Sequence, residues 1–127
     1  KMYGNRPFSS RLLLGRLLER CRTLFEGRLL YTWETLDDLI SFGSESRDSD
    51  MLYQLLLGTR GCQAAAVIRE ESPGVCSAGL RSLYNLDVGQ IAKEFGGGGH
   101  AKAAGFSFSG TREELETLLL PRFSFSD

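Results

Sequence analysis

Four consecutive glycines, Gly96 to Gly99, separate two segments of the chain that have different periodicities. Before them, apolar residues recur at the i, i+3, i+4 and i+7 positions of a helix that Asp87 is expected to cap. These residues are Val88, Ile91, Ala92 and Phe95. After them, residues 103–110 alternate small or aromatic residues with polar ones, which is typical of a half-buried strand. The sequence therefore predicts a helix, a glycine turn and a strand in succession.

Residues 9–26 carry an apolar stripe at helical spacing, and Gly27 is expected to end that helix. The stripe consists of Leu14, Leu17, Leu18, Cys21 and Phe25. Residues 28–35 are rich in aromatic and β-branched types, and the segment is short enough for a strand. The pattern predicts a helix followed by a strand.

A T-x-x-D signal beginning at Thr35 predicts a short helix over 36–42. The polar run 44–50 is expected to form a loop, and residues 51–57 a second helix that ends before Gly58. The candidates for the N-cap of this second helix are Asp48 and Asp50.

Residues 63–72 and 74–83 form two strand-like runs with a tight turn around Pro73-Gly74, and they predict a hairpin. A T-x-x-E capping box at Thr111 and a proline at position 121 bound a last helix. Strand-like segments interleaved with helices indicate a single α/β domain. We expect a mixed β-sheet of about four to five strands flanked by helices.

The composition is that of an ordinary globular domain, with 42% hydrophobic and 24% charged residues among 127. A net charge of −1 argues against a broad electrostatic grip on duplex DNA or an anionic membrane. No stretch approaches the ~20 apolar residues of a membrane helix. The three cysteines, Cys21, Cys62 and Cys76, are widely spaced, so we interpret them as buried thiols in a reducing compartment. We therefore expect a cytoplasmic protein.

The glycine run and His100, the only histidine, are the strongest local signal for binding. The backbone N–H groups of Gly96, Gly97, Gly98 and Gly99 can approach an anion closely, and His100 can donate to a phosphate oxygen. The plainer interpretation is a flexible turn in which Gly96 caps the preceding helix. Neither the G-x-G-x-x-G fingerprint nor the P-loop pattern is present.

Arg81 and Ser82, at the end of the hairpin's second strand, are a second candidate site. A guanidinium offers a planar fork of donors that suits phosphate, and a neighbouring hydroxyl can add another donor. The alternative is an exposed arginine on a strand.

A single histidine and cysteines without zinc spacing give no basis for a metal site in this sequence. Most acidic residues lie at expected helix starts, where interaction with the helix dipole explains them. We therefore predict no catalytic residues and no metal ligands here, and interpret the chain as a binding domain.

The stretch from Leu80 to Gly105, LRSLYNLDVGQIAKEFGGGGHAKAAG, resembles the signature of the DHH-associated domain at the C-terminus of DHH phosphoesterases. The stretches GRLLYTW and MLYQLLLGTRG…AAAVIRE extend the resemblance upstream more diffusely. The departures from the family pattern are Gly79, Leu83 and Asn85, which put the fit of a particular substrate in doubt.

The resemblance implies that a separate N-terminal domain with an Asp-His-His motif holds two manganese-type ions. Residues 1–26, which open with KMYGNRPFSS, would connect that domain to a substrate-binding domain at 27–127. By resemblance, the backbone of Gly97 to Gly99 and His100 would grip a phosphate or terminal nucleotide, with help from Arg81 and Ser82. The chain alone is expected to be inactive.

Within the family, the domain is most similar to the oligoribonuclease and 3′-phosphoadenosine-5′-phosphate phosphatase branch, which implies short RNA or a nucleotide phosphate as substrate. Cyclic dinucleotide phosphodiesterases carry a similar domain and remain an alternative. A further alternative is an RNA-binding and dimerisation domain like that of alanyl-tRNA synthetases. A homodimer is compatible with any of them, and a membrane partner is not expected.

Overall fold

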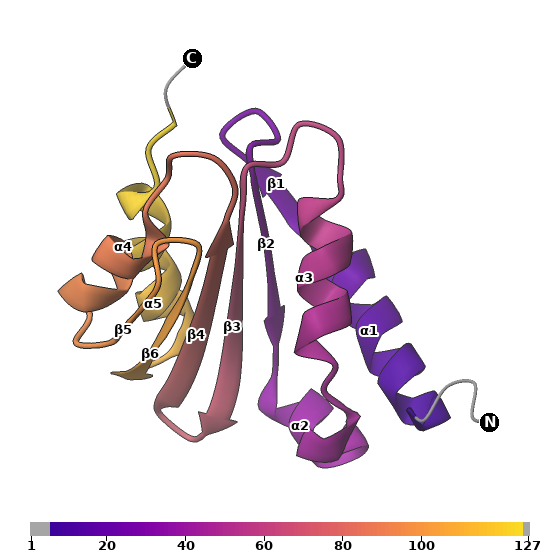
Figure 1. Cartoon of the computed structure of the whole chain (residues 1–127). Helices are drawn as coiled ribbons and strands as arrows, with labels where there is room; N and C mark the ends of the chain where they lie inside the picture. Colours follow the sequence, from indigo (N-terminus) through magenta and orange to yellow (C-terminus); the bar gives the residue numbers. More distant parts are fainter. Residues whose placement is uncertain (1–5, 126–127) are drawn as a thin grey trace.

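The computed structural model describes residues 6–125. Residues 1–5 of the expected connecting segment 1–26, and residues 126–127 of the expected domain 27–127, lie outside the described residues. The core of the molecule is a six-stranded sheet in the order β1-β2-β3-β4-β6-β5 (Figure 1). Strands β2 and β3 are parallel, and every other pair is antiparallel. The strands are β1 (Arg22–Leu24), β2 (Leu29–Glu34), β3 (Ala64–Ser72), β4 (Val75–Ser82), β5 (Gly98–Gly99) and β6 (Ala103–Ser109).

Helices cover both faces of the sheet (Figure 1). They are α1 (Phe8–Arg20), α2 (Leu36–Phe42), α3 (Ser49–Leu57), α4 (Val88–Glu94) and α5 (Arg112–Leu119), with 3-10 turns at Ser44–Ser46 and Leu120–Arg122. The apolar faces of α1 and α3 pack on one side of the sheet, and those of α4 and α5 on the other. No helix among residues 6–125 is long and apolar enough to cross a membrane.

Strand β3 runs through the centre of the sheet and explains its apolar sequence. Its residues from Ala64 to Ile68 are all buried, alternating between the two core clusters. A strand covered on both faces gains from apolar residues at every position rather than at every second one. The parallel pairing of β2 with β3 requires a crossover, which α2 and α3 supply.

The local capping signals in the sequence are confirmed. Thr35 and Thr111 each form a capping box, with Asp38 and Glu114 as the third residues of α2 and α5. Asp48, rather than Asp50, caps α3 by accepting a hydrogen bond from the Met51 N–H. Asp87 caps α4 in the same way. The hairpin of β3 and β4 around Pro73-Gly74 and the mixed α/β class are also as predicted.

The predicted helix over 9–26 is wrong at its C-terminal end. Helix α1 stops at Arg20. The chain continues as β1, then turns back as β2, which pairs antiparallel with β1. Phe25 (φ 53°), Glu26 (φ 58°) and Gly27 (φ 86°) form the left-handed turn between the two strands. Phe25 contacts the ring of Phe125, with 5.4 Å between centroids, instead of extending the helical stripe. Pairing with β2 satisfies this segment's backbone better than a helix that would project beyond the sheet.

Two further expectations need correction. The sheet has six strands rather than four to five, because the short edge strands β1 and β5 were not predicted. Residues 44–50 are not wholly a loop, since a 3-10 turn occupies Ser44–Ser46 and α3 begins at Ser49. All three cysteines are free thiols, with Cys62 and Cys76 buried and Cys21 half-buried.

Candidate functional site

The first two glycines of the run end helix α4. The Gly96 N–H donates to the Lys93 carbonyl at 3.0 Å, and the Gly97 N–H donates to the Ala92 carbonyl at 2.9 Å. With Gly96 at φ 84°, this is the Schellman arrangement that commonly closes a helix. The two N–H groups are therefore engaged inside the protein, and the interpretation of Gly96 as part of a helix cap is confirmed.

The last two glycines form β5 and begin a hairpin with β6. His100 and Ala103 exchange backbone hydrogen bonds of 2.8 and 3.3 Å, which closes a turn over Ala101 and Lys102. Because antiparallel pairs alternate, Gly98 is then hydrogen-bonded to β6 and the Gly99 N–H is directed to the open edge of the sheet. The backbone donor that the glycine run can offer to a ligand is thus chiefly that of Gly99.

Steric requirements differ along the run. A Cβ on Gly97 would lie 2.2 Å from the Gly105 carbonyl oxygen, and one on Gly99 would lie 2.6 Å from the Ala103 carbonyl oxygen. Gly99 also has φ 140°. A Cβ on Gly98, by contrast, would meet nothing within 4 Å. Packing therefore explains the glycines at 97 and 99, whereas the fold itself does not require one at 98.

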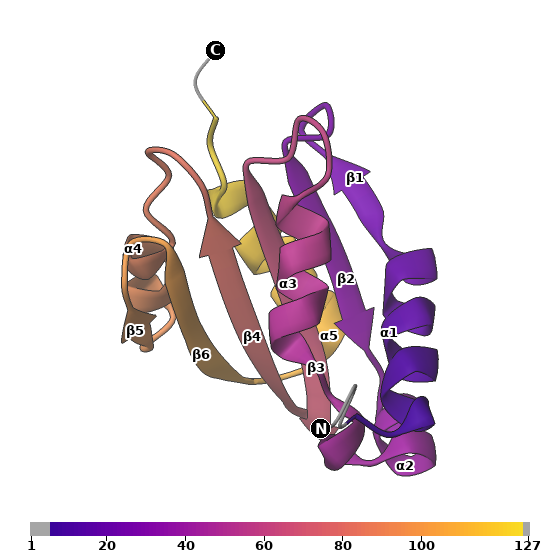
Figure 2. The ribbon, with the colours of Figure 1, turned by 45° about the vertical axis from the view of Figure 1, so that its right-hand side comes forward.

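The sheet register brings parts of both predicted sites onto one face. Arg81 pairs with Ala103, which pairs with His100, so these three residues share the face on which α3 lies. The next row on the same face is Gly79, Gly105 and Gly98. We call these six residues the open patch. In Figure 2, β4 lies between β6 and α3, and no helix stands in front of β6.

Arg81 is the charged residue of the open patch. Its guanidinium carbon lies 4.3 Å from the centroid of the Tyr53 ring, and its Nη1 donates to the Leu80 carbonyl at 2.9 Å. No carboxylate forms an ion pair with it among residues 6–125, whereas every other arginine there that is buried or half-buried has one. Those others are Arg20, Arg28, Arg47, Arg69 and Arg112. Arg81 thus has donors left for an anionic ligand.

Ser82 lies apart from Arg81, although the two are adjacent in sequence. It faces the α4 side of the sheet and is 3% exposed. Its hydroxyl is 2.7 Å from the Leu86 carbonyl oxygen and 3.1 Å from that of Ala101. These contacts fasten the loop before α4 to the turn after His100. Ser82 therefore positions the hairpin and does not face the open patch.

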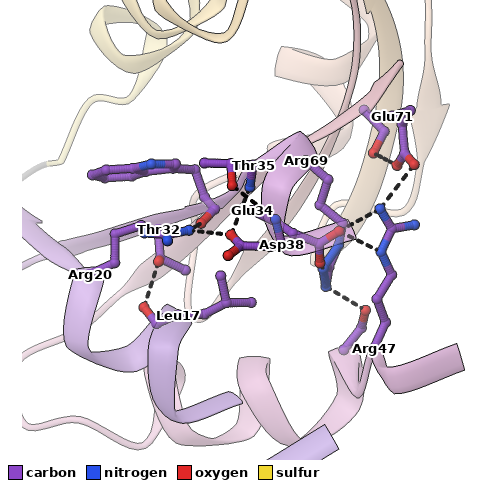
Figure 3. Close-up of polar contacts among 12 residues, drawn as sticks. Leu17, Arg20, Thr32, Glu34, Thr35, Asp38, Arg47, Arg69 and Glu71 are labelled. Atoms are coloured by element: carbon purple, nitrogen blue, oxygen red, sulfur yellow. Dashed lines mark hydrogen bonds and ion pairs between the residues drawn. The ribbon is translucent and has the colours of Figure 1, made fainter. Parts of the chain in front are cut away.

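The opposite end of the same sheet face holds a closed ionic network (Figure 3). Glu34 is fully buried and accepts from Arg69 at 2.8 Å and from Arg47 at 2.6 and 2.9 Å. Arg47 also donates to Glu71 at 2.9 Å, and Ser77 donates to the same carboxylate at 2.6 Å. We call these residues, Glu34, Arg47, Arg69, Glu71 and Ser77, the carboxylate network. Its charges are satisfied internally.

Asp38 adjoins that network at the start of α2 (Figure 3). Burial alone raises the pKa of its carboxyl. Hydrogen bonds from Arg20, from the Thr35 N–H and from Arg16 outweigh burial and lower the pKa to about 2. The arginine of shortest contact, Arg20, lies 2.7 Å away. Asp38 is therefore ionised across the physiological range and joins α1 to α2.

The described residues do not suit a metal ion. Among residues 6–125, no three His, Cys, Asp or Glu side chains gather in a way that could hold one. The arrangement instead suits anion binding, with a guanidinium, an imidazole and an open backbone N–H near one another.

Tyr53 is the residue of this region that sequence reasoning missed. It lies on α3, within a segment whose apolar pattern predicts only packing against the sheet. Its position under Arg81 depends on a contact between residues far apart in the chain, and helical periodicity carries no signal for such a contact.

Comparisons with known proteins agree with this fold. The family profile described as the DHHA1 domain matches residues 30–120. An exopolyphosphatase-related protein from Bacteroides fragilis superposes with a TM-score of 0.77 at 23% identity, over 92% of this chain and 34% of its own. The pGpG-specific phosphodiesterase PggH from Vibrio cholerae superposes with a TM-score of 0.62 at 13% identity, over 87% and 36%.

The chain thus spans about a third of each of these two structures. At this level of identity the superpositions show a shared fold. The profile covers most of the chain, from the second residue of β2 to just past the end of α5, and it shows the family. The chain belongs to the DHHA1 domain family.

Proposed function

We propose that this chain is the substrate-binding domain of a metal-dependent DHH phosphoesterase that acts on short oligonucleotides or nucleotide phosphates, as a nanoRNase or 3′-phosphoadenosine-5′-phosphate phosphatase does. The observation that carries the proposal is Arg81, a half-buried guanidinium without a carboxylate partner among residues 6–125. It shares the open patch with His100, whose side chain is exposed. A cation held rigidly beside an open surface is suited to a phosphate.

In this proposal the domain contributes binding and orientation. Arg81 offers its fork to a phosphate, His100 donates from the hairpin turn, and the Gly99 N–H adds a backbone donor. Fixing the phosphate in this way would hold the scissile bond in place for attack. Because residues 6–125 do not suit a metal, no step passes through a metal held here. A separate N-terminal domain of the same protein would carry the manganese ions, and the chain alone would be inactive.

The named relatives support a phosphorylated ligand without fixing which one. One is called exopolyphosphatase-related and the other is specific for pGpG, a linear dinucleotide. Both names refer to chains of phosphates or phosphodiesters. A cyclic dinucleotide would offer the open patch a similar phosphodiester, so that substrate remains the alternative within the proposal.

Titration of the isotope-labelled chain with a 5′-phosphorylated dinucleotide, followed by NMR, tests the proposal. We expect saturable shifts of the amides of Arg81, Gly99 and His100, and loss of saturation in His100→Ala. The same dinucleotide without its 5′-phosphate is the control, and it should bind more weakly. Equal shifts with both ligands, or none at millimolar concentration, would contradict a phosphate site on this domain.

A further inference from the structure

Tyr53 reaches from α3 over the border of the open patch. The structure places its hydroxyl directly above Gly79, because a Cβ on that glycine would lie 2.2 Å from the hydroxyl oxygen. The ring atoms are farther from the same point, at 3.4 and 3.9 Å. The tip of the side chain therefore lies over β4, next to the uncovered strand β6.

The hydroxyl of Tyr53 has no hydrogen-bond partner among residues 6–125. The side chain is nevertheless well covered, since Tyr53 is only 7% exposed. The fully buried side-chain atoms without partners in the described chain are Ser10 Oγ and Arg112 Nε, so the Tyr53 oxygen retains contact with solvent. Buried tyrosines usually find a partner for this group. An oxygen that has no partner in the described chain and lies over Gly79, a residue of the open patch, is placed to meet a ligand there.

We propose that the Tyr53 hydroxyl donates a hydrogen bond to a phosphate oxygen of the ligand that Arg81 binds. The inference rests on the proposed function and adds a ligand-binding residue that neither the sequence pattern nor the family resemblance assigns. Tyr53 and Arg81 form one unit, because the ring carries the guanidinium on its face at 4.3 Å while the hydroxyl extends beyond it. Together they present several donors and a single positive charge, the pattern that a phosphate ester accepts.

The protonation state of Tyr53 supports this role. Burial raises the pKa of the hydroxyl above its ordinary value, although the charges of Arg81 and Arg69 lower it in part. The group therefore keeps its proton at neutral pH and acts as a donor. The position of the Tyr53 hydroxyl also explains the glycine at position 79, since any side chain there would displace the hydroxyl.

Tyr53→Phe tests the inference, because it removes the oxygen and keeps the ring beneath Arg81. We expect an unchanged melting temperature and an affinity for the 5′-phosphorylated dinucleotide lower by about tenfold, the usual effect of losing a hydrogen bond to a charged group. Tyr84→Phe is the matched control, since Tyr84 is an exposed tyrosine on the loop before α4 and should bind as the wild type does.

A spectroscopic measurement separates a direct contact from an indirect one. In protein labelled at the tyrosine ζ carbon, the ligand should shift the Tyr53 signal saturably and leave Tyr31, whose hydroxyl already bonds Glu116, unmoved. If the backbone amides saturate while Tyr53 does not shift and Tyr53→Phe binds normally, the inference is overturned and the proposed function stands. If wild-type amides show no saturable binding, the proposed function fails and takes this inference with it.

Discussion

The arginines in two regions of the same sheet face have opposite kinds of partner, carboxylates in one region and an aromatic ring in the other. In the carboxylate network, Arg47 and Arg69 converge on Glu34, which is fully buried (Figure 3). In the open patch, Arg81 rests on an aromatic ring and forms no ion pair with any carboxylate of residues 6–125. Both regions draw on β4, which contributes Ser77 to the network and Gly79 and Arg81 to the open patch. Sequence proximity therefore does not decide which arginine is available to a ligand.

This difference in partners gives the charges different roles. The charges of the carboxylate network stabilise the fold, and the charge of the open patch can bind a ligand. A buried carboxylate with two guanidinium partners has its desolvation offset within the fold, so the network fixes β2, β3 and the 3-10 turn relative to one another. A guanidinium held by stacking keeps its positive charge uncompensated and accessible. Substitutions in the first region should change stability, and substitutions in the second should change affinity.

Glu34→Gln should have the largest effect. It leaves two guanidinium groups beside a neutral amide in a buried site, and breaking a buried ion pair in this way costs about 3–5 kcal/mol. Urea unfolding followed by circular dichroism measures the loss. Glu19→Gln, at an exposed position of α1, is the control and should cost less than about 0.5 kcal/mol. Equal costs for the two variants would show that the network contributes little to the fold.

Asp38, which adjoins the carboxylate network, makes the stability of the protein depend on pH. Its folded pKa of about 2 lies below the ordinary 3.8, so its stabilisation is complete above pH 3.8 and is lost as pH falls through about 2. We expect Asp38→Asn to be less stable than wild type by about 2 kcal/mol at pH 6, and the gap to narrow toward pH 2. Unfolding curves at both pH values check this, and a gap independent of pH would contradict it.

Arg81→Ala should act on affinity and spare stability. Loss of a charged donor pair lowers affinity for the phosphorylated dinucleotide by roughly tenfold or more. The free energy of unfolding should change by less than about 1 kcal/mol, because no ion pair is broken. Isothermal titration calorimetry and urea unfolding give the two values. Arg60→Ala, in the exposed loop after α3, is the matched control, and the same loss of affinity in both variants would argue against a defined site.

Gly98→Ala should give the smallest effect. Its added methyl group meets nothing in the protein but projects onto the open patch, so we expect unchanged stability and an affinity lower by about threefold. Gly15→Ala serves as control, because that glycine also has free space around it and lies on α1. Calorimetric titration distinguishes the two variants. Tighter binding by Gly98→Ala would mean that the ligand does not cross this position.

The sequence predicted those parts of the fold that local signals specify. Thr35 with Asp38, and Thr111 with Glu114, place their helices because a capping box lies within a single turn. Strands β1 and β5 escaped prediction because each is very short and is defined by its partner strand. The glycines of β5 also carry no side-chain alternation, which is the usual signal of a strand.

The candidate site was predictable in composition but not in arrangement. Arg81, Gly99 and His100 could be named from residue chemistry alone. Ser82 was grouped with Arg81 because the two are adjacent, yet consecutive residues of a strand point to opposite faces, and alternation separates them. Tyr53 could not be found, since its contact with Arg81 exists only after α3 packs on the sheet.

Arg81 is available to a phosphate, whereas Arg47 and Arg69 are engaged within the fold. The NMR signals of the three arginine side chains test this difference most directly. The measurement is an NMR titration with the 5′-phosphorylated dinucleotide that follows the three Nε–H signals together. We predict a saturable shift of the Arg81 signal and no shift of the other two. A titration in which Arg81 stays unmoved, or in which all three shift alike, would contradict the account.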